Sequence, residues 1–111
     1  MKRKRWIYVC SPLRGTPPYT PAKYKKNLRK VTDYCRQVVE EGETPIAPHL
    51  FFSSFLDDHE PEERKAGMAA GIEMLEKCEE VWVFDSENGI SEGMKTEIEH
   101  AGEIGIPVKY R

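Results

Sequence analysis

Apolar residues along this chain of 111 residues occur in two patterns: short continuous runs, and longer stretches in which they recur every three or four positions. Continuous runs of this kind predict buried strands. The run at residues 81–84 has no polar position and is therefore expected at the centre of a sheet with both faces covered. Residues 6–10 predict a second strand, which leads through Ser-Pro and Gly-Thr-Pro-Pro into a long loop. Shorter strands are expected over residues 44–48, near an edge because each proline removes a ladder donor, and over residues 107–110.

The three- and four-residue spacing predicts three helices. The first covers residues 21–41, between an N-cap at Thr20 and a stop at Gly42, and its apolar face comprises Tyr24, Leu28, Val31, Cys35, Val38 and Val39. The second opens at residue 60 and runs to about residue 77, with inward side chains Met68, Ile72 and Leu75. The third covers residues 91–103, with inward side chains Met94, Ile98 and Ala101. Residues 49–60 show neither a continuous apolar run nor the three- and four-residue spacing. We expect the phenylalanines at 51, 52 and 55 to pack over a neighbouring surface, and residues 57–59 to form a turn.

Strands and helices alternate along the chain, which requires right-handed crossovers and a parallel sheet. The sequence therefore predicts a single domain over residues 1–111 with a three-layer α/β fold of the flavodoxin-like or Rossmann-like class, built on a short parallel sheet of four or five strands. In such sheets ligands bind at the carboxyl ends of the strands. This rule directs attention to the loops at residues 11–20 and 85–93.

The composition narrows the class of protein. Hydrophobic residues make up 39% and charged residues 32% of the chain, as in an ordinary globular protein. A net charge of -2 argues against a nucleic acid polymer as partner, and we interpret the basic residues at 1–5 and 23–30 as a solvated tail and a solvated helix face. The three cysteines, Cys10, Cys35 and Cys78, are odd in number and widely spaced, which favours reduced thiols and a cytoplasmic protein. No segment has the length of a signal peptide core or a membrane span.

The first loop offers the side chains that a polar ligand needs. Ser11 has a hydroxyl, Arg14 a guanidinium and Gly15 a flexible backbone, and such a set can hold a phosphate through charge-assisted hydrogen bonds. The alternative is an ordinary Ser-Pro turn with an arginine that faces solvent. The second loop feeds a helix N-terminus at Ser91, where free N–H groups favour an anion, although Ser91 alone is more typical of an N-cap.

Glu97 is the candidate for chemistry at this helix. It lies four residues after Gly93, on the same helical face, and borders the apolar stripe of Met94 and Ala101. Gly93 has no side chain and would let a ligand lie against the backbone, where the Glu97 carboxylate meets it. A carboxylate placed there suits attack on a sugar carbon as a glycosidic bond breaks. The alternative is that Glu97 belongs to a solvated acidic face with Glu92, Glu99 and Glu103.

Residues 7–15 together with residues 91–97, Ser-Glu-Gly-Met-Lys-Thr-Glu, resemble the nucleoside 2-deoxyribosyltransferase superfamily. Within it the chain is similar to the 2'-deoxynucleoside 5'-phosphate N-hydrolases and to small bacterial and phage members. The hydrolases have a Tyr and an Arg six residues apart at the first strand, matched by Tyr8 and Arg14, and a Ser and a catalytic Glu six apart at the last helix, matched by Ser91 and Glu97. Many transferases have Asp at the position of Ser91, so serine favours the branch that accepts a 5'-phosphate.

The resemblance implies cleavage or transfer at the N-glycosidic bond of a (deoxy)nucleoside 5'-monophosphate. Glu97 would be the nucleophile and Tyr8 would orient it or the sugar, while the substrate would be held by Ser11, Arg14, Gly15, Ser91, Gly93, Met94 and His49. His49 is alternatively a packed structural histidine, and Arg64 is a further candidate for the phosphate. The resemblance implies no cofactor, a small nucleoside or nucleotide as partner, no membrane, and a homodimer or higher homo-oligomer.

The sequence also departs from the hydrolases. Alignment places Gly71 where they carry an Asp that assists the leaving base, and Asp58 and Glu73 are the acids that we consider in its stead. A non-catalytic nucleotide-binding or sensing module is therefore the alternative function. A metal site from His49, Asp57, Asp58 and His59 matches no standard ligand spacing. Receiver domains and the lysine-decarboxylase-like phosphoribohydrolases are disfavoured, because Cys10-Ser11 replaces the paired acids of the former and the glycine run of the latter is missing.

Overall fold

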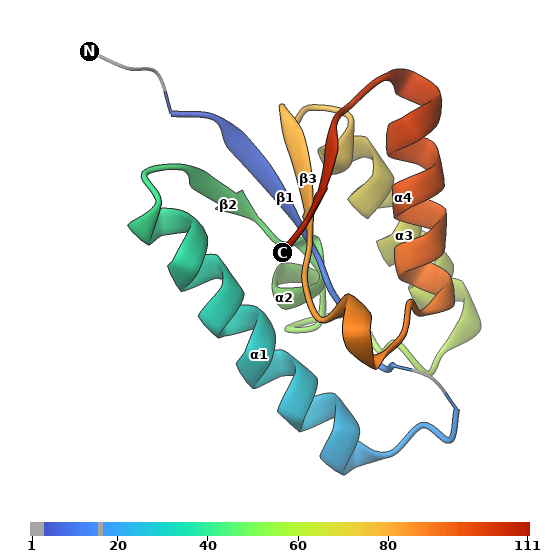
Figure 1. Cartoon of the computed structure of the whole chain (residues 1–111). Helices are drawn as coiled ribbons and strands as arrows, with labels where there is room; N and C mark the ends of the chain where they lie inside the picture. The colour runs from blue at the N-terminus through green and yellow to red at the C-terminus, as the bar shows by residue number, and fades with distance from the viewer. Residues whose placement is uncertain (1–3, 16) are drawn as a thin grey trace.

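Four parallel strands form the sheet, in the order β2-β1-β3-β4 (Figure 1). The computed structural model describes residues 4–15 and 17–111, so the predictions for residues 1–3 and for Thr16 lie outside the described residues. The strands are β1 (Trp6–Cys10), β2 (Thr44–Ile46), β3 (Glu80–Val83) and β4 (Val108–Tyr110). The predicted parallel sheet, the edge position of β2 and the inner position of β3 are confirmed. The strands were predicted too long, because Ala47, Pro48, Phe84 and Pro107 lie outside them.

Helices cover both faces of the sheet and make three layers. The helices are α1 (Pro21–Glu40), α2 (Pro48–Phe52), α3 (Pro61–Leu75) and α4 (Glu92–Ile104), with a 3-10 turn, η1 (Ser86–Asn88), after β3. Figure 1 shows α1 on one side of the strands and α3 and α4 on the other. The three-layer α/β fold predicted from the sequence is confirmed.

Successive side chains of β1 pack into the two cores on opposite faces of the sheet. Ile7 and Val9 pack with Val31 of α1, whereas Tyr8 and Cys10 join the core on the opposite side, which is formed with α3 and α4. Successive side chains of a strand point to opposite faces, so this division follows from the strand itself. It places Tyr8 and Cys10 next to α4, the helix that carries Glu97.

The helix ends follow the signals in the sequence. The Thr20 hydroxyl accepts a hydrogen bond from the backbone N–H of Lys23 at 3.1 Å, and α1 is followed by Gly42 with φ of +87°. One inward position was wrong: Val39 is 57% exposed, while Val38 is buried. Neighbouring helix residues are turned by about 100°, so only one of the two valines can face the sheet.

The region after β2 differs most from expectation. Pro48 opens the short helix α2 instead of ending a strand, and His49 lies on that helix. The three phenylalanines pack edge to face on one another, with ring centroids 5.1, 5.2 and 5.6 Å apart. Phe51 and Phe55 nevertheless stay 60% and 57% exposed, so the expected packing over another surface is only partial.

A cluster of charged side chains joins the strands at the end of the sheet where they begin. Arg5 precedes β1 and donates from Nε to Glu43 Oε2 at 2.7 Å and from Nη1 to Glu80 Oε2 at 2.6 Å. Lys109 Nζ lies 3.1 Å from the same Glu80 oxygen, and Trp82 Nε1 donates to the other at 2.8 Å. These contacts connect all four strands, because Glu43 directly precedes β2, Glu80 opens β3 and Lys109 belongs to β4.

Two further predictions concern thiols and membranes. Cys10, Cys35 and Cys78 are all free, and Cys35 is half-buried while the other two are buried. Among residues 4–15 and 17–111, no helix has the combination of length and apolar character needed to cross a membrane.

Candidate active site

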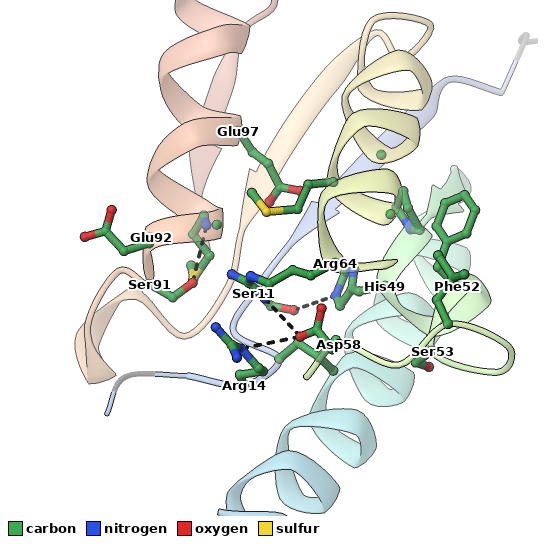
Figure 2. A pocket seen from close by; sticks show the side chains of 18 of the residues that line it. Ser11, Arg14, His49, Phe52, Ser53, Asp58, Arg64, Ser91, Glu92 and Glu97 are labelled. Carbon is green, nitrogen blue, oxygen red and sulfur yellow. Dashed lines mark hydrogen bonds and ion pairs between the residues drawn. The ribbon is translucent and has the colours of Figure 1, made fainter. Parts of the chain in front are cut away.

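A pocket lies at the carboxyl ends of β1 and β2 and the N-terminus of α4, where the fold rule places ligands. Figure 2 shows side chains from the β1–α1 loop, α2, the α2–α3 loop, α3 and α4 that converge on it. All nine residues to which the resemblance assigns catalysis or substrate binding line this pocket: Tyr8, Ser11, Arg14, Gly15, His49, Ser91, Gly93, Met94 and Glu97.

Glu97 is the largely buried carboxylate of this pocket. The Tyr8 hydroxyl donates a hydrogen bond to Glu97 Oε2, and the Cys10 thiol lies 3.5 Å from Glu97 Oε1 as a second donor. Burial raises the pKa of Glu97 from 4.5 to about 7, while the hydrogen bonds from Tyr8 and Cys10 act in the opposite direction. The solvated acidic face considered from the sequence therefore does not include Glu97, although Glu92, Glu99 and Glu103 are exposed.

Tyr8 and Cys10 act as donors only. Burial, followed by the negative charge of Glu97, raises the pKa of both groups far above the physiological range. They therefore stay protonated and fix the orientation of the two carboxylate oxygens. Cys10 was not among the residues predicted for the site, because its contact joins β1 to a helix 87 positions later in the chain.

Ser11 and His49 form a polar pair on another wall of the pocket. The Ser11 Oγ lies 3.3 Å from His49 Nε2, and the Ser11 residue is buried with 7% exposure. Burial lowers the pKa of His49 to about 4, so the ring is neutral at physiological pH. A neutral imidazole beside a hydroxyl can accept or donate a hydrogen bond, but it brings no positive charge to an anion.

Positive charge comes from two arginines at the pocket. Arg14 Nε lies 3.5 Å and Arg64 Nη1 lies 3.0 Å from the same oxygen of Asp58, Oδ2 (Figure 2). The Arg14 guanidinium also stacks on the Tyr19 ring at 4.1 Å from its centroid. Arg14 and Arg64 therefore face one space, and Asp58 lies between them.

The N-terminus of α4 contributes a helix end to the pocket. The Ser91 hydroxyl accepts a hydrogen bond from Met94 N at 3.3 Å, so Ser91 is the N-cap, the alternative weighed from the sequence. It still lines the pocket. A Cβ added at Gly93 would meet no atom within 4 Å, so the space above this glycine is open. Gly15 has φ of +79°, a conformation that glycine adopts without strain.

The two acids considered for the leaving base are placed differently. Asp58 lines the pocket, whereas Glu73 is on the exposed face of α3 and does not line it. A Cβ at Gly71 would lie 3.6 Å from the Tyr8 hydroxyl oxygen, so this position borders the Tyr8–Glu97 pair. Apolar side chains that the sequence analysis did not assign to a site complete the lining: Leu13, Phe52, Leu56, Met68 and Ile72.

Comparison with known proteins gives a family. The family described as domain of unknown function DUF7768 matches residues 5–111. The chain belongs to the DUF7768 family. In the part of this DUF7768 protein that the structure describes, no three His, Cys, Asp or Glu side chains are grouped to hold a metal ion. A search of curated proteins found no match to it.

One solved structure shows the same fold as this DUF7768 protein. It is a 2-deoxyribosyltransferase from the psychrotolerant bacterium Bacillus psychrosaccharolyticus, similar with a TM-score of 0.66 over 95% of this chain and 70% of that chain. The two sequences share 16% identity. At this identity the similarity shows the fold alone.

Proposed function

We propose that this protein cleaves or transfers at the N-glycosidic bond of a (deoxy)nucleoside 5'-monophosphate, with Glu97 as the nucleophile. The observation that supports this most directly is the carboxylate of Glu97, sheltered in the pocket and contacted by the donors Tyr8 and Cys10. The shared fold with a 2-deoxyribosyltransferase supports the same class of reaction.

The proposed reaction has two steps. A Glu97 oxygen bonds to C1' of the sugar as the bond from C1' to the base nitrogen breaks, and the leaving base takes a proton from solvent, which the attacking water or second base returns in the next step. Water then attacks C1' of the glycosyl ester in a hydrolase, or a second base does so in a transferase, which frees the carboxylate. Tyr8 holds the attacking group in place through its hydrogen bond to Glu97.

The phosphate would lie at Arg14 and the N-terminus of α4. Arg14 supplies a fixed guanidinium stacked on Tyr19, and the open space at Gly93 gives access to backbone N–H groups at the helix start. Replacement of Arg14 by Gln should therefore raise the KM for monophosphates more than the KM for free nucleosides. The exposed Arg29→Gln is a matched control, and equal losses for both substrate types in Arg14→Gln would exclude the phosphate contact.

The decisive experiment incubates the protein with deoxynucleoside and ribonucleoside 5'-monophosphates and with the free nucleosides, and follows base release by chromatography. Release should be lost in Glu97→Gln and kept in Glu99→Gln, an exposed glutamate of the same helix. Base release that persists in Glu97→Gln would remove Glu97 from the role of nucleophile.

A binding or sensing module is the second candidate, and Gly71 favours it. The similar hydrolases carry an acid at this position, whereas Gly71 supplies no side chain beside Tyr8. A module of this kind would bind monophosphates, measured as a rise in melting temperature, and release no base from any of them. Base release with any substrate of the panel would reject it.

A further inference from the structure

Three charged side chains from three segments meet at the pocket. Arg14 comes from the β1–α1 loop, Asp58 from the α2–α3 loop and Arg64 from α3, and Figure 2 shows both guanidiniums directed at the Asp58 carboxylate. Asp58 Oδ2 lies 3.0 Å from Arg64 Nη1 and 3.5 Å from Arg14 Nε. One carboxylate oxygen therefore forms ion pairs with two guanidiniums, and all three residues line the pocket.

The contact between Arg14 and Asp58 leaves a donor unsatisfied. Arg14 Nε is buried, and it makes no hydrogen bond in spite of the nearby carboxylate. Buried donors almost always have a partner, so an orphan of this kind calls for an explanation. The Arg14 guanidinium stacks on the Tyr19 ring, 4.1 Å from its centroid, and Asp58 leaves its Nε–H without a hydrogen bond. The arrangement is better suited to a larger anion with several oxygens than to the single oxygen of Asp58.

The other charges around the pocket do not replace Asp58 in this position. Glu63 accepts a hydrogen bond from the Asp57 backbone at 3.2 Å, and Glu92 is exposed and points away from the arginines in Figure 2. Glu97 is held by its own two donors. Asp58 is thus the carboxylate that pairs with both arginines, and an anion that binds them must compete with its negative charge.

We propose that Asp58 is an internal competitor for the anion site, which holds Arg14 and Arg64 when no anion is bound and is displaced from them by the phosphate of the substrate. That the anion is a 5'-phosphate rests on the proposed function, whereas the competition itself does not require turnover. Binding is then an exchange of one anion for another. Only a ligand whose negative charge attracts the two arginines more strongly than Asp58 does can displace it. Asp58 therefore favours a phosphate monoester over ligands with a weaker negative charge.

The test measures anion binding directly. Asp58→Asn keeps the shape of the side chain and removes its charge, and it should lower the Kd of inorganic phosphate and of deoxyuridine 5'-monophosphate by about tenfold in calorimetric titrations. Free deoxyuridine should bind with an unchanged Kd. Asp57→Asn is the matched control, since it makes the same change in net charge at a neighbouring residue that does not line the pocket.

A second pair of variants tests the mechanism. If Asp58 competes for Arg64, the gain from Asp58→Asn should shrink to less than threefold in an Arg64→Gln background, because one of the two contested cations is gone. An unchanged or higher phosphate Kd in Asp58→Asn, or an equal gain in Asp57→Asn, overturns the competition. The two proposals fail separately: a lack of base release rejects the reaction, whereas these Kd values alone decide the role of Asp58.

Discussion

The burial of Glu97 should make the stability of the protein depend on pH in a defined direction. Its pKa is raised from 4.5 to about 7 in the folded state. A raised carboxyl pKa means that the folded protein favours the neutral form, so the contribution is fully present below about pH 4.5 and is lost as pH rises through about 7. The shift corresponds to about 3 kcal/mol of unfolding free energy when Glu97 is fully ionised.

Replacement of Glu97 by Gln isolates this effect. The amide has the shape of the neutral carboxyl and does not titrate, so the variant should gain stability relative to the wild type as pH rises. We expect similar unfolding free energies near pH 4, and an advantage of the variant that approaches about 3 kcal/mol near pH 9. Urea denaturation followed by circular dichroism at several pH values measures it, with Glu99→Gln as the control.

One result would refute the reasoning. If the difference in unfolding free energy between wild type and Glu97→Gln stays constant from about pH 5 to about pH 9, Glu97 titrates as an ordinary exposed glutamate. The carboxylate would then not be sheltered in the pocket, and the observation that most directly supports its role as nucleophile would be lost.

Substitutions at three other positions test the surroundings of Glu97. Cys10→Ala should raise the pKa of Glu97 further by up to about one unit, because a donor is lost, and Cys10→Ser should restore or lower it; the pH dependence of stability measures both, and an unchanged pKa in Cys10→Ala would contradict the thiol contact. Ser91→Ala should cost about 1 kcal/mol of unfolding free energy through loss of the cap on Met94 N, and a loss of similar size in Ser91→Asp would argue against capping. Gly71→Ala should stabilise α3 by about 0.5–1 kcal/mol, because the added Cβ meets its nearest atoms at 3.6 and 3.7 Å, and a clear destabilisation would show that the pocket wall is tighter there.

Much of the fold followed from local patterns. The apolar runs predicted β1 and β3, and the helical spacing with Thr20 and Ser91 as caps predicted α1 and α4 to within one or two residues at most ends. The helix α2 was missed because it has only five residues, too few for a period to show. Val39 was misplaced because the sequence alone does not say which of two adjacent valines faces the sheet.

The candidate site was predictable where it depended on loop position. The topology brings the ends of β1 and the start of α4 together, so Tyr8, Arg14, Ser91 and Glu97 could be expected in one pocket. Contacts that depend on side-chain packing between distant segments were not predictable. The approach of Cys10 to Glu97 and the position of Asp58 between two arginines are of this kind, and no spacing in the sequence indicates them.

The cluster of Arg5 with Glu43 and Glu80 lies at the beginning of the strands, and the pocket lies at their other end. The register of the sheet is thus secured far from the loops that contact a ligand. We therefore expect exchanges within residues 11–20 and 53–60 to leave the contacts of this charged cluster intact. A library that varies only these two loops would therefore explore new ligand specificities on an unchanged frame, and the same separation gives natural evolution room to diversify this pocket.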